Sequence, residues 1–219
     1  MNIVNSENFK KGCKFAIGRK WYLKDHIPMY VKFKCFKEGK SKDNEIECLR
    51  NNLNSWKACR GGKIDLKELH KNKEGILSKL PKINLGELNI NDYKNVMEVI
   101  EELRKYKINQ KTQKPVKSLV FSSKVAHFYF CGLIPVIDST IREILKTLEV
   151  RGKDDEELYE KYLKLGNEEL KNNQNNQQEV EKIYEYINKM PDCSVDRKGL
   201  NIDAKIYEWC LLGWCNKKQ

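Results

Sequence analysis

The stretch that decides the fold is SLVFSSKVAHFYFCGLIPVIDSTIREILKTL, residues 118–148. Residues 116–131 are hydrophobic on nearly every side, which predicts a central, buried helix. Gly132 ends that helix, and Pro135 fixes the turn that follows. A second helix begins near Asp138, because the apolar residues beyond it recur at helical spacing. The stretch therefore predicts a buried helix, a tight turn and an amphipathic helix.

Helical periodicity continues on both sides of this stretch. Apolar residues recur at spacings of three and four, which predicts amphipathic helices. The expected helices run from residue 44 to the glycines at 61 and 62, and over 65–79, 91–106, 155–170, 179–190 and 202–214. Residues 14–36 differ, because Tyr30, Val31 and Phe33 stand among lysines, and this composition favours a strand or irregular structure. We therefore expect a mainly α protein of at least seven helices that allows a small N-terminal strand region.

The length bounds the domain organisation. A chain of 219 residues suffices for one well-buried domain, with or without a small annex. We divide it into an irregular or strand segment at 1–40, an N-terminal helical part at 41–115 and a second helical part at 116–219. We treat the three parts as one functional unit.

The charge balance points to a polyanionic partner. The chain has 42 Lys and Arg against 31 Asp and Glu, a formal net charge of +11. Such a balance favours nucleic acid or anionic lipid. Lysine is abundant along the whole chain. Nucleotide-composition bias in the source genome therefore explains part of this excess of lysine as well as a selected binding surface does. Among the polyanions we expect double-stranded DNA as the partner, and the oligomeric state is left open.

Targeting and cysteine patterns narrow the class of protein. Polar residues follow Met1, so we expect no export signal and a cytoplasmic location. The longest apolar stretch, residues 125–137, is too short to span a bilayer, so we expect no membrane role. The eight cysteines contain no C-x-x-C pair, which favours buried free thiols over a zinc site or a disulfide scaffold. We accordingly expect neither a metal nor a cofactor.

Two short motifs in the central stretch carry a family resemblance. Lys124-Val125-Ala126 heads the buried helix, and Pro135-Val136-Ile137-Asp138 forms the turn after it. Over about residues 116–215 the sequence resembles the helix-hairpin-helix DNA glycosylase superfamily, in which a catalytic lysine begins a helix and an aspartate follows in a Pro-Val-Asp turn. The resemblance implies a multi-helix glycosylase-like body that acts in DNA repair.

The resemblance is that of a divergent member. Val120-Phe121-Ser122-Ser123 replaces the glycine-rich hairpin of the family, the interval between Lys124 and Asp138 is shorter, and Ile137 precedes the aspartate. A looser group of uncharacterised relatives combines a Ser-Lys helix and a Pro-Ile-x-Asp-Ser turn with a C-terminal Asp…Trp…Leu-Gly helix. Asp203, Trp209, Leu212 and Gly213 fit that last helix.

The resemblance implies catalytic roles for Asp138 and Lys124. A carboxylate near the sugar stabilises the cation-like transition state of base removal or activates a nucleophile, and Asp138 is the candidate. In a bifunctional enzyme with lyase activity, a neutral lysine amine attacks the sugar carbon and forms a Schiff base, and Lys124 is the candidate. Simpler roles fit the same residues: Asp138 as a helix N-cap and Lys124 as a solvent-reaching or phosphate-binding cation. We interpret His127, on the same helical face as Lys124, as a hydrogen-bonded core histidine.

Further residues are candidates for contacts with nucleic acid. Ser122 and Ser123 at the helix start, and Ser139 at the next one, could hold a phosphate through hydroxyls and amides. Arg60 and Lys63 form a basic turn around two glycines. Trp56, Phe128, Tyr129 and Trp209 could stack on a base, although core packing explains these aromatic residues better.

The expected function is a base-excision glycosylase-like activity on damaged DNA, a hydrolase reaction with Schiff-base lyase activity in the bifunctional case. Two other readings fit the same sequence. One is a nucleic-acid-binding protein that keeps the scaffold and the charge without catalysis, and the other is a helical interaction or defence-associated protein.

Overall fold

The computed structural model describes residues 2–18, 23–42, 44–58, 63–174, 177–189 and 201–215. These residues form ten α-helices, two short 3-10 helices and two short strands, so the fold is mainly α, as the sequence predicts. In chain order the elements are α1 (Ser6–Gly18), α2 (Leu23–Lys37), α3 (Glu45–Ser55), β1 (Lys63–Ile64), α4 (Leu66–Leu77), η1 (Leu85–Glu87), α5 (Ile90–Leu103), η2 (Arg104–Tyr106), β2 (Lys107–Ile108), α6 (Leu119–Tyr129), α7 (Ser139–Thr147), α8 (Asp155–Gln174), α9 (Gln177–Asn188) and α10 (Asp203–Cys215).

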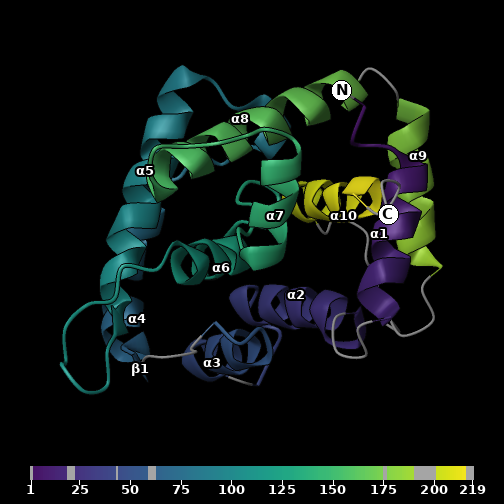
Figure 1. Ribbon diagram of the computed structural model, residues 1–219. Helices are drawn as coiled ribbons and strands as arrows, with labels where there is room; N and C mark the ends of the chain where they lie inside the picture. The colour runs from purple at the N-terminus through teal and green to yellow at the C-terminus, as the bar shows by residue number, and fades with distance from the viewer. Residues whose placement is uncertain are drawn as a thin grey trace.

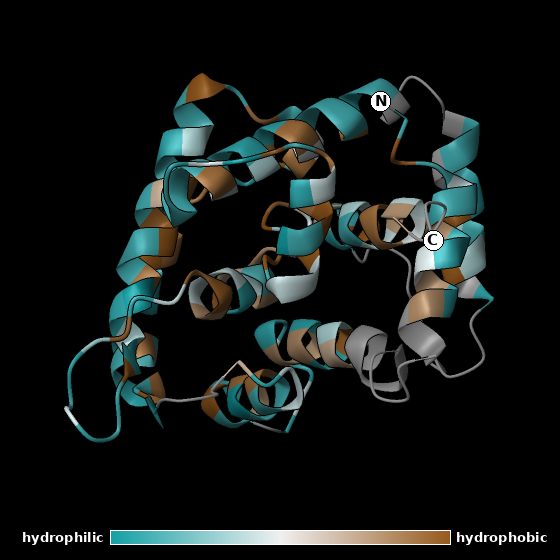
Figure 2. Ribbon diagram, in the orientation of Figure 1, coloured by the Kyte–Doolittle hydropathy of each residue, from teal (hydrophilic) through white to brown (hydrophobic). Residues whose placement is uncertain are grey.

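Three helices occupy the centre of the molecule. Figure 1 shows α6, α7 and α10 in the middle, with α5, α8, α9 and α1 to α3 around them. The predicted central helix is α6, in which nine of the eleven residues are buried. The outer helix α5 is amphipathic instead, and Figure 2 shows its hydrophobic and hydrophilic residues alternating along the ribbon. Its buried residues Val96, Val99, Ile100 and Leu103 recur at spacings of three and four.

Helices from the two ends of the chain pack directly against each other. α1 crosses α10 at Gly12 and Gly213, where a Cβ on Gly213 would stand 2.7 Å from the carbonyl carbon of Asn8. Two carboxylates from later helices also bind the N-terminal backbone: Glu169 accepts from the Ile3 amide at 2.6 Å and Glu179 from the Ser6 amide at 2.8 Å. These contacts, and those of α5 with α6, cross both predicted part boundaries, so the three predicted parts share one core.

The strand expected within residues 14–36 is wrong. The described backbone there belongs to α1 and α2. The buried residues of these helices are spaced as helices require: Phe9 and Cys13 are four apart, and Tyr30 and Phe33 are three apart. β-branched and aromatic residues favour strands only weakly, and packing against neighbouring helices overrides that preference.

The small sheet lies elsewhere in the chain. β1 and β2 pair antiparallel, with Lys63 opposite Ile108, and Ile108 also bridges Pro115. Residues 109–114 form the turn between these positions. Figure 1 shows the loop between β2 and α6 projecting from the molecule beside α4 and β1.

The membrane and cysteine patterns can be checked over the same residues. No helix in the described part of the chain is long and apolar enough to cross a membrane. The described cysteines are all free thiols, and Cys13, Cys48 and Cys210 are buried, as expected. Burial raises the pKa of the Cys210 thiol to about 12, so this thiol is inert at neutral pH. Cys59 and Cys193 lie outside the described residues.

Candidate functional site

Lys124 lies at the middle of α6 and reaches the end of α3. Its ammonium donates to the carbonyl oxygen of Trp56 at 2.8 Å and lies 5.6 Å from the centroid of the Trp56 ring. Trp56 is the C-cap of α3, where carbonyl oxygens attract a cation. The hydrogen bond and the cation–π contact are both favourable for a charged ammonium.

Asp138 is the N-cap of α7. Its Oδ1 accepts from the Ile141 amide at 3.0 Å, and the side chain is half-buried. The second carboxylate oxygen accepts no hydrogen bond from any described residue. Capping therefore uses one oxygen of Asp138 and leaves the other available for chemistry.

The turn before Asp138 is fixed from the side of α6. The Ile137 amide donates to the Ser123 hydroxyl at 3.3 Å, so the sequence neighbours of Lys124 and Asp138 are in direct contact. The Nδ1 of His127 contacts the carbonyl oxygen of Ile134. A carbonyl only accepts, so Nδ1 carries the proton and Nε2 is the acceptor for the hydroxyl of Tyr30, 2.7 Å away.

His127 is a fully buried, neutral core histidine, as the sequence predicts. Burial keeps its pKa well below the ordinary value, and the positive charge of Lys205 lowers it further. The His127 ring therefore links α2 to the turn, through one hydrogen bond with Tyr30 and another with the Ile134 carbonyl.

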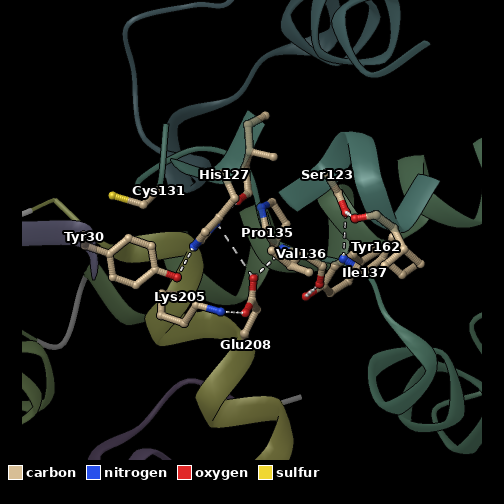
Figure 3. A network of polar contacts seen from close by, with 12 residues as sticks. Tyr30, Ser123, His127, Cys131, Pro135, Val136, Ile137, Tyr162, Lys205 and Glu208 are labelled. Carbon is tan, nitrogen blue, oxygen red and sulfur yellow. Dashed lines mark hydrogen bonds and ion pairs between the residues drawn. The ribbon is translucent and has the colours of Figure 1, made fainter. Parts of the chain in front are cut away.

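The same turn is also held from α8 and α10. Tyr159 donates to the Pro135 carbonyl at 2.8 Å, and Tyr162 donates to the Val136 carbonyl at 3.4 Å. The Val136 amide donates to the carboxylate of Glu208 (Figure 3). The preceding helix α6 and two helices distant in sequence, α8 and α10, thus fix the backbone that leads to Asp138.

Glu208 belongs to a buried ion pair with Lys205, one turn earlier on α10. The two residues are 2% and 1% exposed, and the ammonium of Lys205 also lies 4.9 Å from the centroid of the Trp56 ring. Burial raises the pKa of Glu208, the Lys205 ammonium opposes this rise, and the nearby Asp138 carboxylate adds to it. Figure 3 shows Lys205, Glu208 and His127 converging beneath the turn.

The predicted phosphate contacts of Ser122 and Ser123 need correction. Both side chains are fully buried. The Ser122 hydroxyl donates to the Leu119 carbonyl at 3.1 Å, and the Ser123 hydroxyl donates to the Val120 carbonyl at 3.3 Å while it accepts from the turn. Neither hydroxyl is placed to reach a phosphate, because α6 is buried in the core from its first turn onwards.

The remaining predicted contacts fall in different places. Ser139 is exposed at the start of α7, and Lys63 is exposed on β1. Arg60 lies outside the described residues. The aromatic residues Trp56, Phe128, Tyr129 and Trp209 are all buried in the core, as expected.

A basic segment leads into the site. Residues 103–137 contain seven Lys and Arg and no Asp or Glu. Lys111, Lys114 and Lys117 are exposed on the loop between β2 and α6, and their side chains form no ion pair with a described residue. This loop and Lys63 are joined through the small sheet. They present positive charge directly before the helix that carries Lys124.

The sequence reasoning missed Lys205, Glu208 and the two tyrosines of α8. A signal for the ion pair was present, because Lys205 and Glu208 are opposite charges three residues apart in the otherwise apolar run at 202–214. Tyr159 and Tyr162 carry no such signal, since tyrosines at helical spacing commonly pack in a core.

Comparisons and metal chemistry add no further assignment. Within the described ranges, no group of three or more His, Cys, Asp or Glu side chains could hold a metal ion. No protein-family model, curated protein or solved structure matches the chain.

Proposed function

We propose that this protein is a DNA base-excision glycosylase-like protein, a divergent relative of the helix-hairpin-helix glycosylases, with Asp138 as its catalytic carboxylate. The observation that carries the proposal is the immobilised turn at 134–137, which α6, α8 and α10 hold through buried hydrogen bonds. A helix cap alone does not require such rigidity. A carboxylate that must stand at a fixed place beside a sugar does.

The chemistry assigned to Asp138 follows from its two oxygens. Oδ1 is held by the Ile141 amide, which fixes the plane of the carboxylate. The other oxygen faces the positive charge that develops on the sugar as the bond to the base breaks. A fixed carboxylate stabilises that charge more in the transition state than in the ground state, so it accelerates base release.

The DNA contact is assigned to the basic segment before α6. The exposed Lys111, Lys114 and Lys117 can neutralise successive phosphates, and each contact releases a bound counterion. Phosphate contacts of this kind position the duplex and carry no sequence information. The damaged base is therefore chosen by other parts of the protein.

Lys124 supports a second candidate function, that of a non-catalytic DNA-binding protein. Its ammonium is engaged by the carbonyl and ring of Trp56, two contacts that suit a charged lysine. In a lyase the neutral amine would add to the sugar carbon as the base leaves, and loss of the nitrogen proton with ring opening would give the Schiff base. That step requires Lys124 to leave Trp56.

Base release tests the main proposal. Asp138→Asn keeps a competent N-cap, so it should lower the free energy of unfolding by no more than about 1 kcal/mol. Its rate of base release from duplexes with damaged bases should fall far more than its affinity. Asp65→Asn is the matched control, because Asp65 caps α4 in the same way, accepting from the Glu68 amide at 3.0 Å. Equal rates for both variants, or no release from any lesion by the wild type, would leave only the binding function.

Binding and trapping separate the remaining roles. Duplex affinity should fall steeply with salt, and Lys111, Lys114 and Lys117 changed together to Gln should lower both the affinity and the salt dependence. Changing Lys94, Lys161 and Lys164 to Gln removes the same charge from α5 and α8 and should matter less. Borohydride should trap a covalent adduct on an abasic duplex only if Lys124 acts as a nucleophile, and Lys124→Gln should abolish it.

A further inference from the structure

A cavity of about 490 Å³ opens on a different part of the molecule from Lys124 and Asp138, neither of which lines it. Its walls come from the C-terminal half of α2, the segment before η1, the end of α6 with the loop after it, and the residue two before α10. This volume lies within the range of roughly 300–1,000 Å³ that is usual for small-molecule sites.

The cavity lining is mainly apolar and aromatic. Half-buried Phe130 and Ile83 contribute to it, with the buried rings of Tyr30, Phe33 and Phe128 behind them. Tyr30 and Phe128 pack with ring centroids 5.8 Å apart, so this wall is rigid. A flat ring that packs against Phe130 and Ile83 loses its contact with water and gains aromatic contacts.

One wall of the cavity is built around a glycine. Gly132 approaches Asn201 so closely that a Cβ at this position would stand 2.8 Å from the Asn201 Nδ2. The Asn201 amide in turn donates to the Oδ1 of Asn84, and the Leu85 amide donates to the Gly132 carbonyl at 2.9 Å. The side-chain Nδ2 of Asn84 bonds to no described residue, so this lining residue retains a hydrogen-bond donor, whereas its backbone amide donates to Glu87 at 2.6 Å.

The charge of the cavity is positive. Lys34, Lys37 and Lys82 line it, with Glu38 as the single carboxylate. Glu38 is already engaged by Lys40 at 2.9 Å, outside the lining, and more distantly by Lys34 at 3.8 Å. The lining therefore holds an excess of ammonium groups over carboxylates.

Lys37 is held against the apolar wall. Its ammonium lies 5.7 Å from the centroid of Phe130 and donates to the Tyr129 carbonyl at 2.9 Å. Desolvation lowers the pKa of Lys37 from its ordinary value, although nearby Cys131 and Glu45 oppose the shift. Folding removes part of the water around the Lys37 ammonium, and a bound anion would stabilise its charge in place of that water.

We propose that this cavity binds an aromatic ring that carries an anionic group, the chemistry of a nucleoside monophosphate, either free or at the end of a nucleic-acid strand. The ring packs against Phe130 and Ile83, and the phosphate lies between Lys34, Lys37 and Lys82. Bare phosphate lacks the apolar contact, and an uncharged nucleoside lacks the ionic one. The inference does not depend on the glycosylase proposal, because Lys124, Asp138 and the turn at 134–137 do not line the cavity.

Calorimetric titration of the full chain tests this site. The common nucleoside 5′-monophosphates should bind about tenfold or more tightly than the matching nucleosides or inorganic phosphate, because charge-assisted hydrogen bonds add to ring burial. Lys37→Gln and Lys82→Gln should each weaken nucleotide binding and spare nucleoside binding. Phe130→Leu should weaken both, while Lys94→Gln on α5 should change neither.

Two comparisons make the outcome decisive. A short single strand with a 5′-phosphate, compared with the same strand without it, distinguishes a strand end from a free nucleotide as the source of the ligand. The proposal is overturned if no nucleotide binds at millimolar concentration, or if nucleotides bind equally well to the Lys37, Lys82 and Phe130 variants. Nucleotide binding without base release would refute the glycosylase function alone. Base release that depends on Asp138, without nucleotide binding, would refute this site alone.

Discussion

Removing one charge of the buried ion pair in α10 should destabilise the protein severely. Glu208→Gln keeps an oxygen that can accept from the Val136 amide, so the substitution removes a charge and little else. The Lys205 ammonium, 1% exposed, is then left without its carboxylate. Breaking a buried pair in this way costs about 3–5 kcal/mol. That is a large part of the total stability of an ordinary domain, which is on the order of 5–15 kcal/mol.

The double variant Lys205→Met/Glu208→Gln separates the charge effect from the loss of packing. It removes both charges and retains the acceptor for the turn. Apolar replacements of buried ion pairs are often neutral or stabilising, so we expect it to recover most of the stability that Glu208→Gln loses. The free energy of unfolding would be measured by urea denaturation at pH 7, followed by far-UV circular dichroism.

A matched exposed pair is the control for this prediction. Glu102 and Lys105 are also three residues apart, and their charged atoms are 2.6 Å apart, but their side chains are 33% and 62% exposed. Glu102→Gln should cost less than about 0.5 kcal/mol. A loss under about 1 kcal/mol for Glu208→Gln, or a double variant as unstable as the sum of the single ones, would refute the reasoning. If Glu208→Gln does not fold, the free energy of unfolding of the double variant still tests the prediction, because it should be close to that of the wild type.

Two further predictions concern packing and pH. Gly213→Ala places a Cβ 2.7 Å from the Asn8 carbonyl carbon, and should lower the free energy of unfolding by about 2 kcal/mol or more in urea denaturation. Gly75→Ala, where no atom lies within 4 Å of the new Cβ, should raise it by about 0.5–1 kcal/mol, and a loss there would contradict the helix argument. The unfolded chain protonates His127 below pH 6.5 and the folded protein does not, so the free energy of unfolding should fall by up to about 1.4 kcal/mol per pH unit below 6.5. His127→Gln should flatten this pH dependence of the free energy of unfolding between pH 7.5 and 5.5. Glu208, with its raised pKa, shifts the free energy of unfolding with pH in the opposite direction. Because both proteins contain Glu208, its contribution cancels when they are compared.

The mainly α fold could be predicted because hydrophobic periodicity reports which helix face is buried. The pattern at 91–106 corresponds to α5, which begins at Ile90 with Asn89 as its N-cap, one residue before the predicted start. Such shifts arise because several Asn residues in this stretch can accept from a free amide equally well. The strand prediction for residues 14–36 was wrong for another reason. The burial of these residues is decided by distant helices, which local composition does not encode.

The candidate site could be predicted only in part. The sequence identified Asp138 as a cap and as a candidate catalyst, and the cap is confirmed, whereas the catalytic role stays a prediction. Ser122 and Ser123 were assigned to phosphate as residues of a helix start, but α6 begins at Leu119 and both side chains are fully buried within the helix. The bonds that α8 and α10 make to the turn join residues 24 to 72 positions apart in sequence, and no local pattern reports such pairs.

Burial, together with the positive charge of Lys205 beside Trp56, keeps the histidine of the site neutral. Two ammonium groups, of Lys124 and Lys205, already lie within 5.6 Å of the centroid of the Trp56 ring, and the His127 ring is also 5.6 Å away. A third positive charge there would be repelled, and the pKa of His127, lowered first by burial and then by Lys205, agrees with this. The Lys205 ammonium is paired with Glu208, on which the Asp138 carboxylate also acts electrostatically. The Asp138 carboxylate raises the pKa of Glu208 and the Lys205 ammonium lowers it, so the proposed catalytic carboxylate is coupled electrostatically to the buried ion pair of α10.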